Sequence, residues 1–171
     1  MEKWPPVYDA SYHPDPDSEY WFTEIETMDP EEREQTIILP KLQEQLKYGY
    51  AHSGLYRKKW DAAGVKPEDI RSLEDFEALP ILTKDELRAD QAEHPPFGSN
   101  LCISYNEMGR VHGTSGTTGN PTTFGVSKGD IQRIAETHAR VMWAMGVRPD
   151  DIVFIGSFFS LYWGSWGAML G

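Results

Sequence analysis

The chain has 171 residues, 39% apolar and 25% charged, and its 16 Lys+Arg against 27 Asp+Glu give a formal net charge of −11. A single cysteine, Cys102, excludes an intramolecular disulfide framework, and no apolar run approaches the roughly 20 residues of a membrane span. Nucleic acid and membranes are not expected as partners, because the acidic field repels polyanions and no dense Lys/Arg cluster overrides it. The first residues lack a secretory signal, so the expected compartment is the cytoplasm.

Residues 1–28 combine prolines and acidic residues with tyrosine, tryptophan and phenylalanine, and they show neither helical nor strand periodicity. This pattern predicts an extended arm. Its aromatic content is too high for a solvated tail, so we expect the arm to lie along the body of the protein or along a partner subunit.

Residues 29–95 are predicted to form a small helical unit. A helix start is indicated at Asp29, where an N-cap side chain is followed by proline and two acids, and Pro40 is expected to end or kink this helix. Two further amphipathic stretches follow it. Ser72 and Thr83 each stand three residues before a carboxylate, which is the capping-box arrangement and predicts two more short helices.

Residues 96–171 change character to short β-type runs and glycines. Strands are predicted at Leu101–Tyr105, Arg110–His112, Thr122–Val126 and Ile152–Gly156. Between the last two, a capping box of Ser127 and Asp130 starts a long helix that ends at Gly146. Strand, helix and apolar strand in this order are typical of an α/β sheet covered by helices.

The last residues form an aromatic segment, Ser157–Trp166, followed by a short apolar stretch that stops at Gly171 with no polar flank. Such a run needs partners to cover it, so we expect the chain to be cut inside a larger fold.

Gly113–Gly119 form the part of the sequence that points most directly to chemistry, with three glycines and four hydroxyl side chains in seven residues. Glycines let backbone amides converge on an anion, and hydroxyls add donors without charge, so the loop is suited to phosphate. It matches neither the P-loop spacing nor Gly-x-Gly-x-x-Gly. The alternative interpretation is a polar hairpin loop without a ligand.

The string from Ser115 to Pro121, Ser-Gly-Thr-Thr-Gly-Asn-Pro, resembles the ATP-binding signature of the acyl-adenylate-forming superfamily. That signature is usually followed by lysine, whereas Thr122 stands here, and this departure resembles the phenylacetate–CoA ligase branch. Tyr56–Ile70 and Leu79–Leu87 are similar to the N-terminal small domain of those ligases. The resemblance runs from about residue 29 to residue 171.

The resemblance implies an α/β protein in which a small N-terminal helical unit precedes the start of the large adenylate-forming domain. It implies an ATP-dependent carboxylate–CoA ligase, which converts an acid and ATP into acyl-AMP and pyrophosphate and then forms the acyl-CoA. ATP, Mg²⁺ and coenzyme A are the expected cofactors, and the expected acid is an aryl acid such as phenylacetate. A homodimer through the N-terminal unit is also compatible with this branch.

The resemblance also implies two sets of site residues. The expected contacts to the ATP phosphates are Thr114, Ser115, Gly116, Thr117, Thr118, Gly119 and Pro121. The expected acyl-pocket residues are Phe158, Phe159, Tyr162, Trp163 and Trp166. Core or inter-domain packing is the alternative for these aromatics. The phenylacetate enzymes are glycine-rich where Leu161 and Tyr162 stand here, so the pocket is expected to be reshaped.

Other side chains receive structural interpretations. His112 precedes the loop, where a ligand contact or, more typically, a structural hydrogen bond is expected. His138 on the long helix and the unpartnered Cys102 are expected to be packing residues. Histidines and acids show no metal-ligand spacing, so no protein metal site is predicted.

The chain lacks the family's segments for adenine, ribose and the catalytic lysine, so the 171 residues alone are expected to be inactive. The alternative function is a non-catalytic segment that serves dimerisation and nucleotide binding. A P-loop nucleotide hydrolase is disfavoured, because Gly-Lys-Ser/Thr is missing from the loop.

Overall fold

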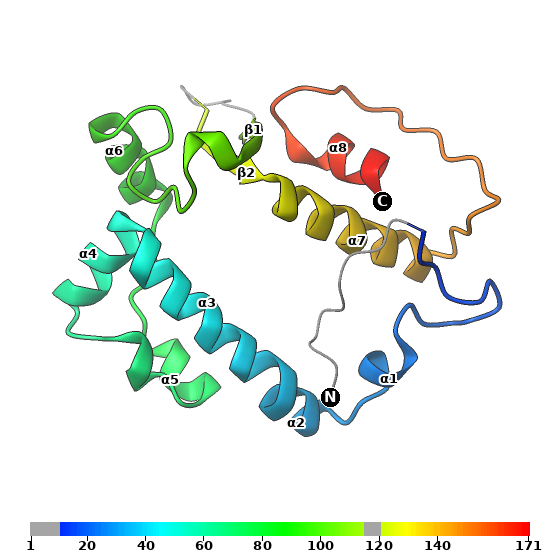
Figure 1. Ribbon diagram of the computed structural model, residues 1–171, viewed down its shortest axis with the longest axis horizontal. Helices are drawn as coiled ribbons and strands as arrows, with labels where there is room; N and C mark the ends of the chain where they lie inside the picture. The colour runs from blue at the N-terminus through cyan, green and yellow to red at the C-terminus, as the bar shows by residue number, and fades with distance from the viewer. Residues whose placement is uncertain (1–10, 115–120) are drawn as a thin grey trace.

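The computed structural model describes residues 11–114 and 121–171, and it consists of two helical groups joined by a short β-hairpin (Figure 1). The first group contains α2 (Pro30–Arg33), the π-helical turn η1 (Glu34–Ile38), α3 (Leu39–His52), α4 (Gly54–Ala62), the 3₁₀ turn η2 (Pro67–Asp69), α5 (Leu73–Glu77) and α6 (Lys84–Glu93). The second part contains α1 (Thr23–Glu26), the 3₁₀ turn η3 (Tyr105–Glu107), β1 (Met108–Gly113), β2 (Thr123–Ser127), α7 (Lys128–Ala144) and α8 (Trp163–Leu170).

The helix that starts at Asp29 continues through Pro40, contrary to the expected end or kink. Asp29 caps it as predicted, since its carboxylate accepts from the amides of Glu31 and Glu32 at 3.0 and 3.2 Å. The π-helical turn lies directly before α3, and Pro40 falls in the first turn of α3, where a missing amide removes least hydrogen bonding. The chain therefore changes helix type before the proline and continues.

The core of the helical unit lies between α3, α4 and the segment after η2. It is built on Leu46, Trp60 and Ile70, with Leu42, Tyr50, Tyr56, Val65 and Leu79 packed around them. The predicted caps of the next two helices are confirmed, because Ser72 accepts from the Asp75 amide at 3.0 Å and Thr83 forms a full capping box with Glu86. The proposed domain boundaries at residues 28 and 95 stay predictions.

Residues 11–28, the described part of the predicted N-terminal arm, lie along the body of the protein, which is one of the two expected placements, but they are not wholly extended because Thr23–Glu26 form helix α1. The indole N–H of Trp143 on α7 donates to the Ser18 carbonyl at 3.0 Å, and the rings of Trp21 and Trp143 meet edge to face at 5.6 Å. Arg148 stacks on Trp143 and donates to the Pro16 carbonyl at 2.9 Å. Trp21 is 8% exposed, so this chain alone buries it.

The β1–β2 hairpin is antiparallel, with Gly113 opposite Thr123, and α7 follows β2 through the predicted Ser127–Asp130 capping box. Helix α8 packs against α7 (Figure 1). The hairpin therefore confirms the predicted strands at Arg110–His112 and Thr122–Val126. At the ends of the strands that face the loop, the predicted and observed bounds differ by one residue.

Two predicted strands are wrong. Leu101–Tyr105 is irregular, because Ser104 and the Glu107 carboxylate close the η3 turn instead. Ile152–Gly156 is not a strand either, and Ile152 and Phe154 are 100% and 91% exposed. A buried strand needs neighbours on both sides, and the described residues form only the two-stranded sheet. No helix in the described part of the chain is long and apolar enough to cross a membrane.

Candidate active site

The hairpin frames the phosphate-type loop and closes its base. The Thr114 amide donates to the Thr122 carbonyl at 3.0 Å, and the Thr122 amide donates to the Thr114 hydroxyl oxygen at 3.1 Å. Among the predicted phosphate contacts, Thr114 and Pro121 are thereby placed at the two ends of the loop. The others lie outside the described residues: Ser115, Gly116, Thr117, Thr118 and Gly119.

Thr122 has a buried place at the base of the loop that could not be predicted from the sequence. Its side chain is 2% exposed, and its hydroxyl has no hydrogen-bond partner within residues 11–114 and 121–171. A short side chain fits this buried place at the base of the loop, where the superfamily signature usually has lysine. The only sign of this in the sequence was that threonine stands at position 122 in place of the signature's lysine.

The aromatic segment lies against the start of the loop, although the two are far apart in the sequence. The carbonyl of Leu161 accepts from the Gly113 amide at 2.9 Å and from His112 Nδ1 at 3.1 Å. The His112 ring also meets Trp163 at 3.9 Å between centroids, and the Arg110 guanidinium lies 4.3 Å above the Trp166 ring. The end of β1 is therefore joined to the aromatic segment by several contacts.

The five predicted pocket residues do not share one environment. Phe158, Phe159 and Tyr162 are 68%, 45% and 49% exposed, whereas Trp163 and Trp166 are half-buried. The segment is held by polar contacts rather than by burial of its rings: Trp166 Nε1 donates to the Ser160 carbonyl at 2.8 Å, and the Ser165 hydroxyl to the Phe158 carbonyl at 2.8 Å. Packing within residues 11–114 and 121–171 does not account for the three exposed rings.

His112 is buried and neutral. It is 4% exposed, and burial lowers its pKa below the usual 6.5; the hydrogen bond to Leu161 opposes this shift and nearby Arg110 adds to it. Because a carbonyl can only accept, Nδ1 carries the proton, and Nε2 of the neutral ring is then an acceptor. In the described part of the chain, Nε2 has no hydrogen-bond partner.

The remaining candidates have structural environments. His138 Nδ1 bonds to the Ile134 carbonyl at 2.9 Å within α7. Cys102 donates to the Asn100 carbonyl at 3.3 Å, and burial raises the pKa of its thiol, which disfavours the reactive thiolate. The described residues contain no group of three or more His, Cys, Asp or Glu side chains that could hold a metal ion.

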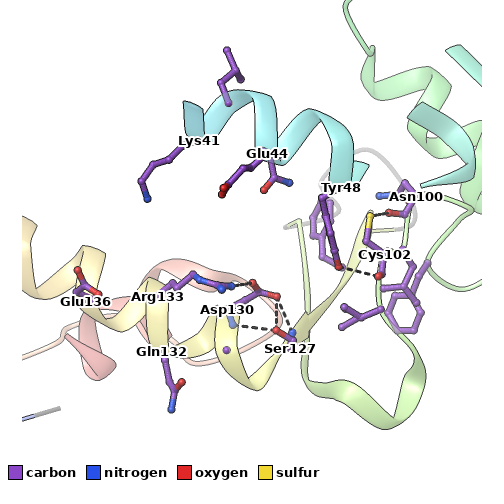
Figure 2. A pocket seen from close by; sticks show the side chains of 18 of the residues that line it. Lys41, Glu44, Tyr48, Asn100, Cys102, Ser127, Asp130, Gln132, Arg133 and Glu136 are labelled. Carbon is purple, nitrogen blue, oxygen red and sulfur yellow. Dashed lines mark hydrogen bonds and ion pairs between the residues drawn. The ribbon is translucent and has the colours of Figure 1, made fainter. Parts of the chain in front are cut away.

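A groove of about 1460 Å³ lies between α3 and α7, away from the aromatic segment. Figure 2 shows Lys41, Glu44 and Tyr48 on α3 facing Asp130 and Arg133 on α7. Two of its polar contacts are local to the groove: the Tyr48 hydroxyl donates to the Cys102 carbonyl at 3.0 Å, and Arg133 pairs with Asp130 at 3.0 Å. Sequence patterns did not indicate this groove.

Comparisons with known proteins identify relatives of this chain. No protein-family model matches the chain. It is 36% identical over 147 residues to the phenylacetate-coenzyme A ligase of Escherichia coli. The aligned residues cover 86% of this chain and 32% of that relative. It is 36% identical over 144 residues to the enzyme of the same name from Thermus thermophilus, with coverages of 84% and 31%.

A crystal structure of 2-hydroxyisobutyryl-CoA ligase in complex with 2-HIB-AMP and CoA, in the thioesterification state, matches with a TM-score of 0.91 and 49% identity. The match covers 98% of this chain and 35% of that one. The chain therefore has the fold of the N-terminal region of an adenylate-forming CoA ligase. Its relatives within that class include the phenylacetate–CoA ligases and 2-hydroxyisobutyryl-CoA ligase, and it spans about a third of their length.

Proposed function

We propose that the full-length protein to which this chain belongs is an ATP-dependent acid–CoA ligase. In the first step a substrate carboxylate attacks the α-phosphorus of ATP and pyrophosphate leaves. In the second, the thiol of coenzyme A gives up its proton and attacks the acyl carbonyl, and AMP leaves. The observation that carries this proposal is the contact of the loop base with the aromatic segment, in a chain 49% identical to a ligase solved with an acyl-adenylate and CoA.

The loop is the proposed phosphate-binding element. Its backbone amides and hydroxyls would neutralise the departing pyrophosphate, which is the main task of a protein in phosphoryl-group chemistry. The proposed contacts are Thr114, Ser115, Gly116, Thr117, Thr118, Gly119 and Pro121. Mg²⁺ would arrive with ATP as part of the metal–nucleotide substrate, and the proposed compartment is the cytoplasm, where ATP and coenzyme A are available.

The aromatic segment is the proposed wall of the acyl pocket, with Phe158, Phe159, Tyr162, Trp163 and Trp166 as candidate contacts. The exposure of three of these rings supports a role toward a ligand or toward the rest of the protein. Leu161 and Tyr162 are bulky where the phenylacetate enzymes are glycine-rich, so in this proposal their side chains would leave less room for an aryl acid.

We propose a short, branched 2-hydroxy acid as the substrate in place of the expected aryl acid. The chain is 49% identical to the ligase for 2-hydroxyisobutyrate and 36% identical to the phenylacetate enzymes, and the bulky Leu161 and Tyr162 favour the smaller acid. The second candidate remains phenylacetate, which the names of the curated relatives favour. Dimerisation through the N-terminal unit stays a prediction.

The test is acyl-CoA formation by the full-length protein with 2-hydroxyisobutyrate and with phenylacetate. We expect kcat/KM for 2-hydroxyisobutyrate to exceed that for phenylacetate by at least about tenfold, since a misfit of a few methylenes in an apolar pocket has effects of this size. The isolated 171 residues serve as the control and should form no product. A preference for phenylacetate would establish the second candidate. Turnover by the isolated segment would refute the expectation that the 171 residues alone are inactive.

A further inference from the structure

The carbonyl of Leu161 is a junction between the loop and the aromatic segment. It accepts two hydrogen bonds from consecutive residues, the Gly113 amide at 2.9 Å and His112 Nδ1 at 3.1 Å. Both of its acceptor sites are therefore used by the residues that lead into the loop. A Cβ on Gly113 would lie 3.6 Å from the Leu161 Cβ, so the backbones are already in close approach.

Side chains on one face of β1 also contact α8. Arg110 and His112 are two residues apart and so share one face of the strand, while Trp163 and Trp166 are three apart and share one face of the helix. Arg110 stacks on Trp166 and His112 meets Trp163 edge on, so the two periodicities match across the interface.

Of the β1 residues, only His112 contacts both the Leu161 backbone and a ring of the aromatic segment within residues 11–114 and 121–171. Its ring is 4% exposed and is held on one side by the hydrogen bond and on another by Trp163. Without its Nδ1 hydrogen bond, the Leu161 carbonyl would be held at this junction by the Gly113 amide alone and would be free to shift.

We infer that His112 is a positioning residue that holds the Leu161–Trp163 stretch in register with Gly113 and Thr114 at the base of the phosphate loop and thereby sets selectivity for the size of the acid. The inference rests on the proposed function. An acid carboxylate must reach the α-phosphorus of a nucleotide held by the loop, and a displacement of about 1 Å in such an arrangement can cost two orders of magnitude in rate. The Gly113 amide and the His112 ring together hold the aromatic segment against the base of the loop, and only the His112 contacts are made by a side chain that can be substituted.

Three substitutions in the full-length protein separate positioning from packing. His112→Asn keeps an N–H donor near the place of Nδ1, His112→Gln moves the amide to the place of Nε2, and His112→Leu removes both. Val111→Ala is the matched control, because Val111 is the next residue on β1 and is 40% exposed on the strand's other face. For each variant, kcat and KM are measured for ATP, 2-hydroxyisobutyrate and phenylacetate, together with the unfolding midpoint.

We expect His112→Leu and His112→Gln to lower kcat/KM for the preferred acid about tenfold or more, chiefly through kcat because the carboxylate is misplaced for attack, and to reduce the ratio between the two acids. The KM for ATP should change less than about threefold, and His112→Asn should recover most of the loss. Val111→Ala should keep the wild-type ratio. If His112→Leu does not fold, the difference in kcat/KM between His112→Asn and His112→Gln decides between a positioning role and a purely structural one.

Unchanged selectivity in all three variants would overturn the inference. So would equal losses for ATP and acid that follow the unfolding midpoint and that Asn does not rescue, because these are the signs of a purely structural residue. A wild-type protein that uses neither acid nor any other carboxylate would instead refute the proposed function, and the inference would fall with it.

Discussion

At the scale of single residues, capping side chains could be predicted and buried polar ones could not. Ser127 and Asp130 stand three residues apart and form the expected capping box, since this motif depends only on local geometry. His112 is buried against Leu161 and Trp163, which are distant in the sequence, and Thr122 is buried across the loop from Thr114, and their sequence neighbours carry no sign of either. Their roles at the base of the loop therefore required the structure.

Glu86 makes a residue-scale prediction about pH. Hydrogen bonds from Lys59 and from the amide and hydroxyl of Thr83 lower its pKa from 4.5 to about 2. A carboxylate with a depressed pKa stabilises the folded state above its unfolded pKa, and this contribution is lost as the pH falls from about 4.5 toward 2. Glu86→Gln should thus lower the unfolding midpoint at pH 7 and flatten its acid dependence.

The control for this prediction is Glu93→Gln, at the exposed other end of α6. The measurement is the unfolding midpoint of both variants and the wild type between pH 7 and pH 3. If Glu86→Gln keeps the wild-type slope below pH 4.5, the Lys59 and Thr83 contacts are not what holds this carboxylate ionised.

At the scale of elements, helices were easier to predict than strands. The helical unit follows from caps and apolar spacing, both of which are local. Ile152–Gly156 has the composition of a buried strand, but a strand depends on ladder partners, and none lies beside it in the residues described. Pro40 was misjudged for a related reason, because a change to π-helical geometry just before it allows the helix to continue.

The packing of α8 on α7 makes an element-scale prediction at Gly167. A Cβ there would lie 2.2 Å from His138 Nε2, and the His138 ring is held by its bond to the Ile134 carbonyl. Gly167→Ala should therefore force the two helices apart and lower the free energy of opening of α8 by about 1–3 kcal/mol, the usual cost of overpacking. Hydrogen exchange of the α8 amides in the full-length protein measures this.

Two further variants make the Gly167 prediction specific. Met169→Ala changes an exposed residue of the same helix and should leave the exchange rates nearly unchanged. Adding His138→Ala to Gly167→Ala should recover part of the protection, because it removes the clash. Normal exchange in Gly167→Ala alone would show that α8 does not pack as closely as its contacts with α7 indicate.

At the scale of the whole molecule, the loop and the aromatic segment were both found in the sequence, but the contact between them was not. The resemblance named both the phosphate loop and the aromatic segment, yet His112 and Leu161 are 49 positions apart, and only the fold brings them together. The net charge of −11 adds a constraint to the proposed function, since an acidic protein that binds ATP and coenzyme A would need local neutral donors for phosphate. In our proposal the amides and hydroxyls between residues 113 and 119 supply them.

The measurement that tests this account most directly is acid-dependent pyrophosphate release from ATP by the full-length protein and by its Gly116→Val variant. Gly129→Val is the control, because a Cβ at Gly129 meets only ordinary contacts at 3.8 and 3.9 Å. The wild type and the control should release pyrophosphate only when a carboxylic acid is present, and Gly116→Val should lose roughly a hundredfold or more in kcat/KM for ATP at an unchanged unfolding midpoint. Pyrophosphate release by Gly116→Val at the wild-type rate, or none from the wild type with any acid, would contradict a phosphate-binding role for this loop.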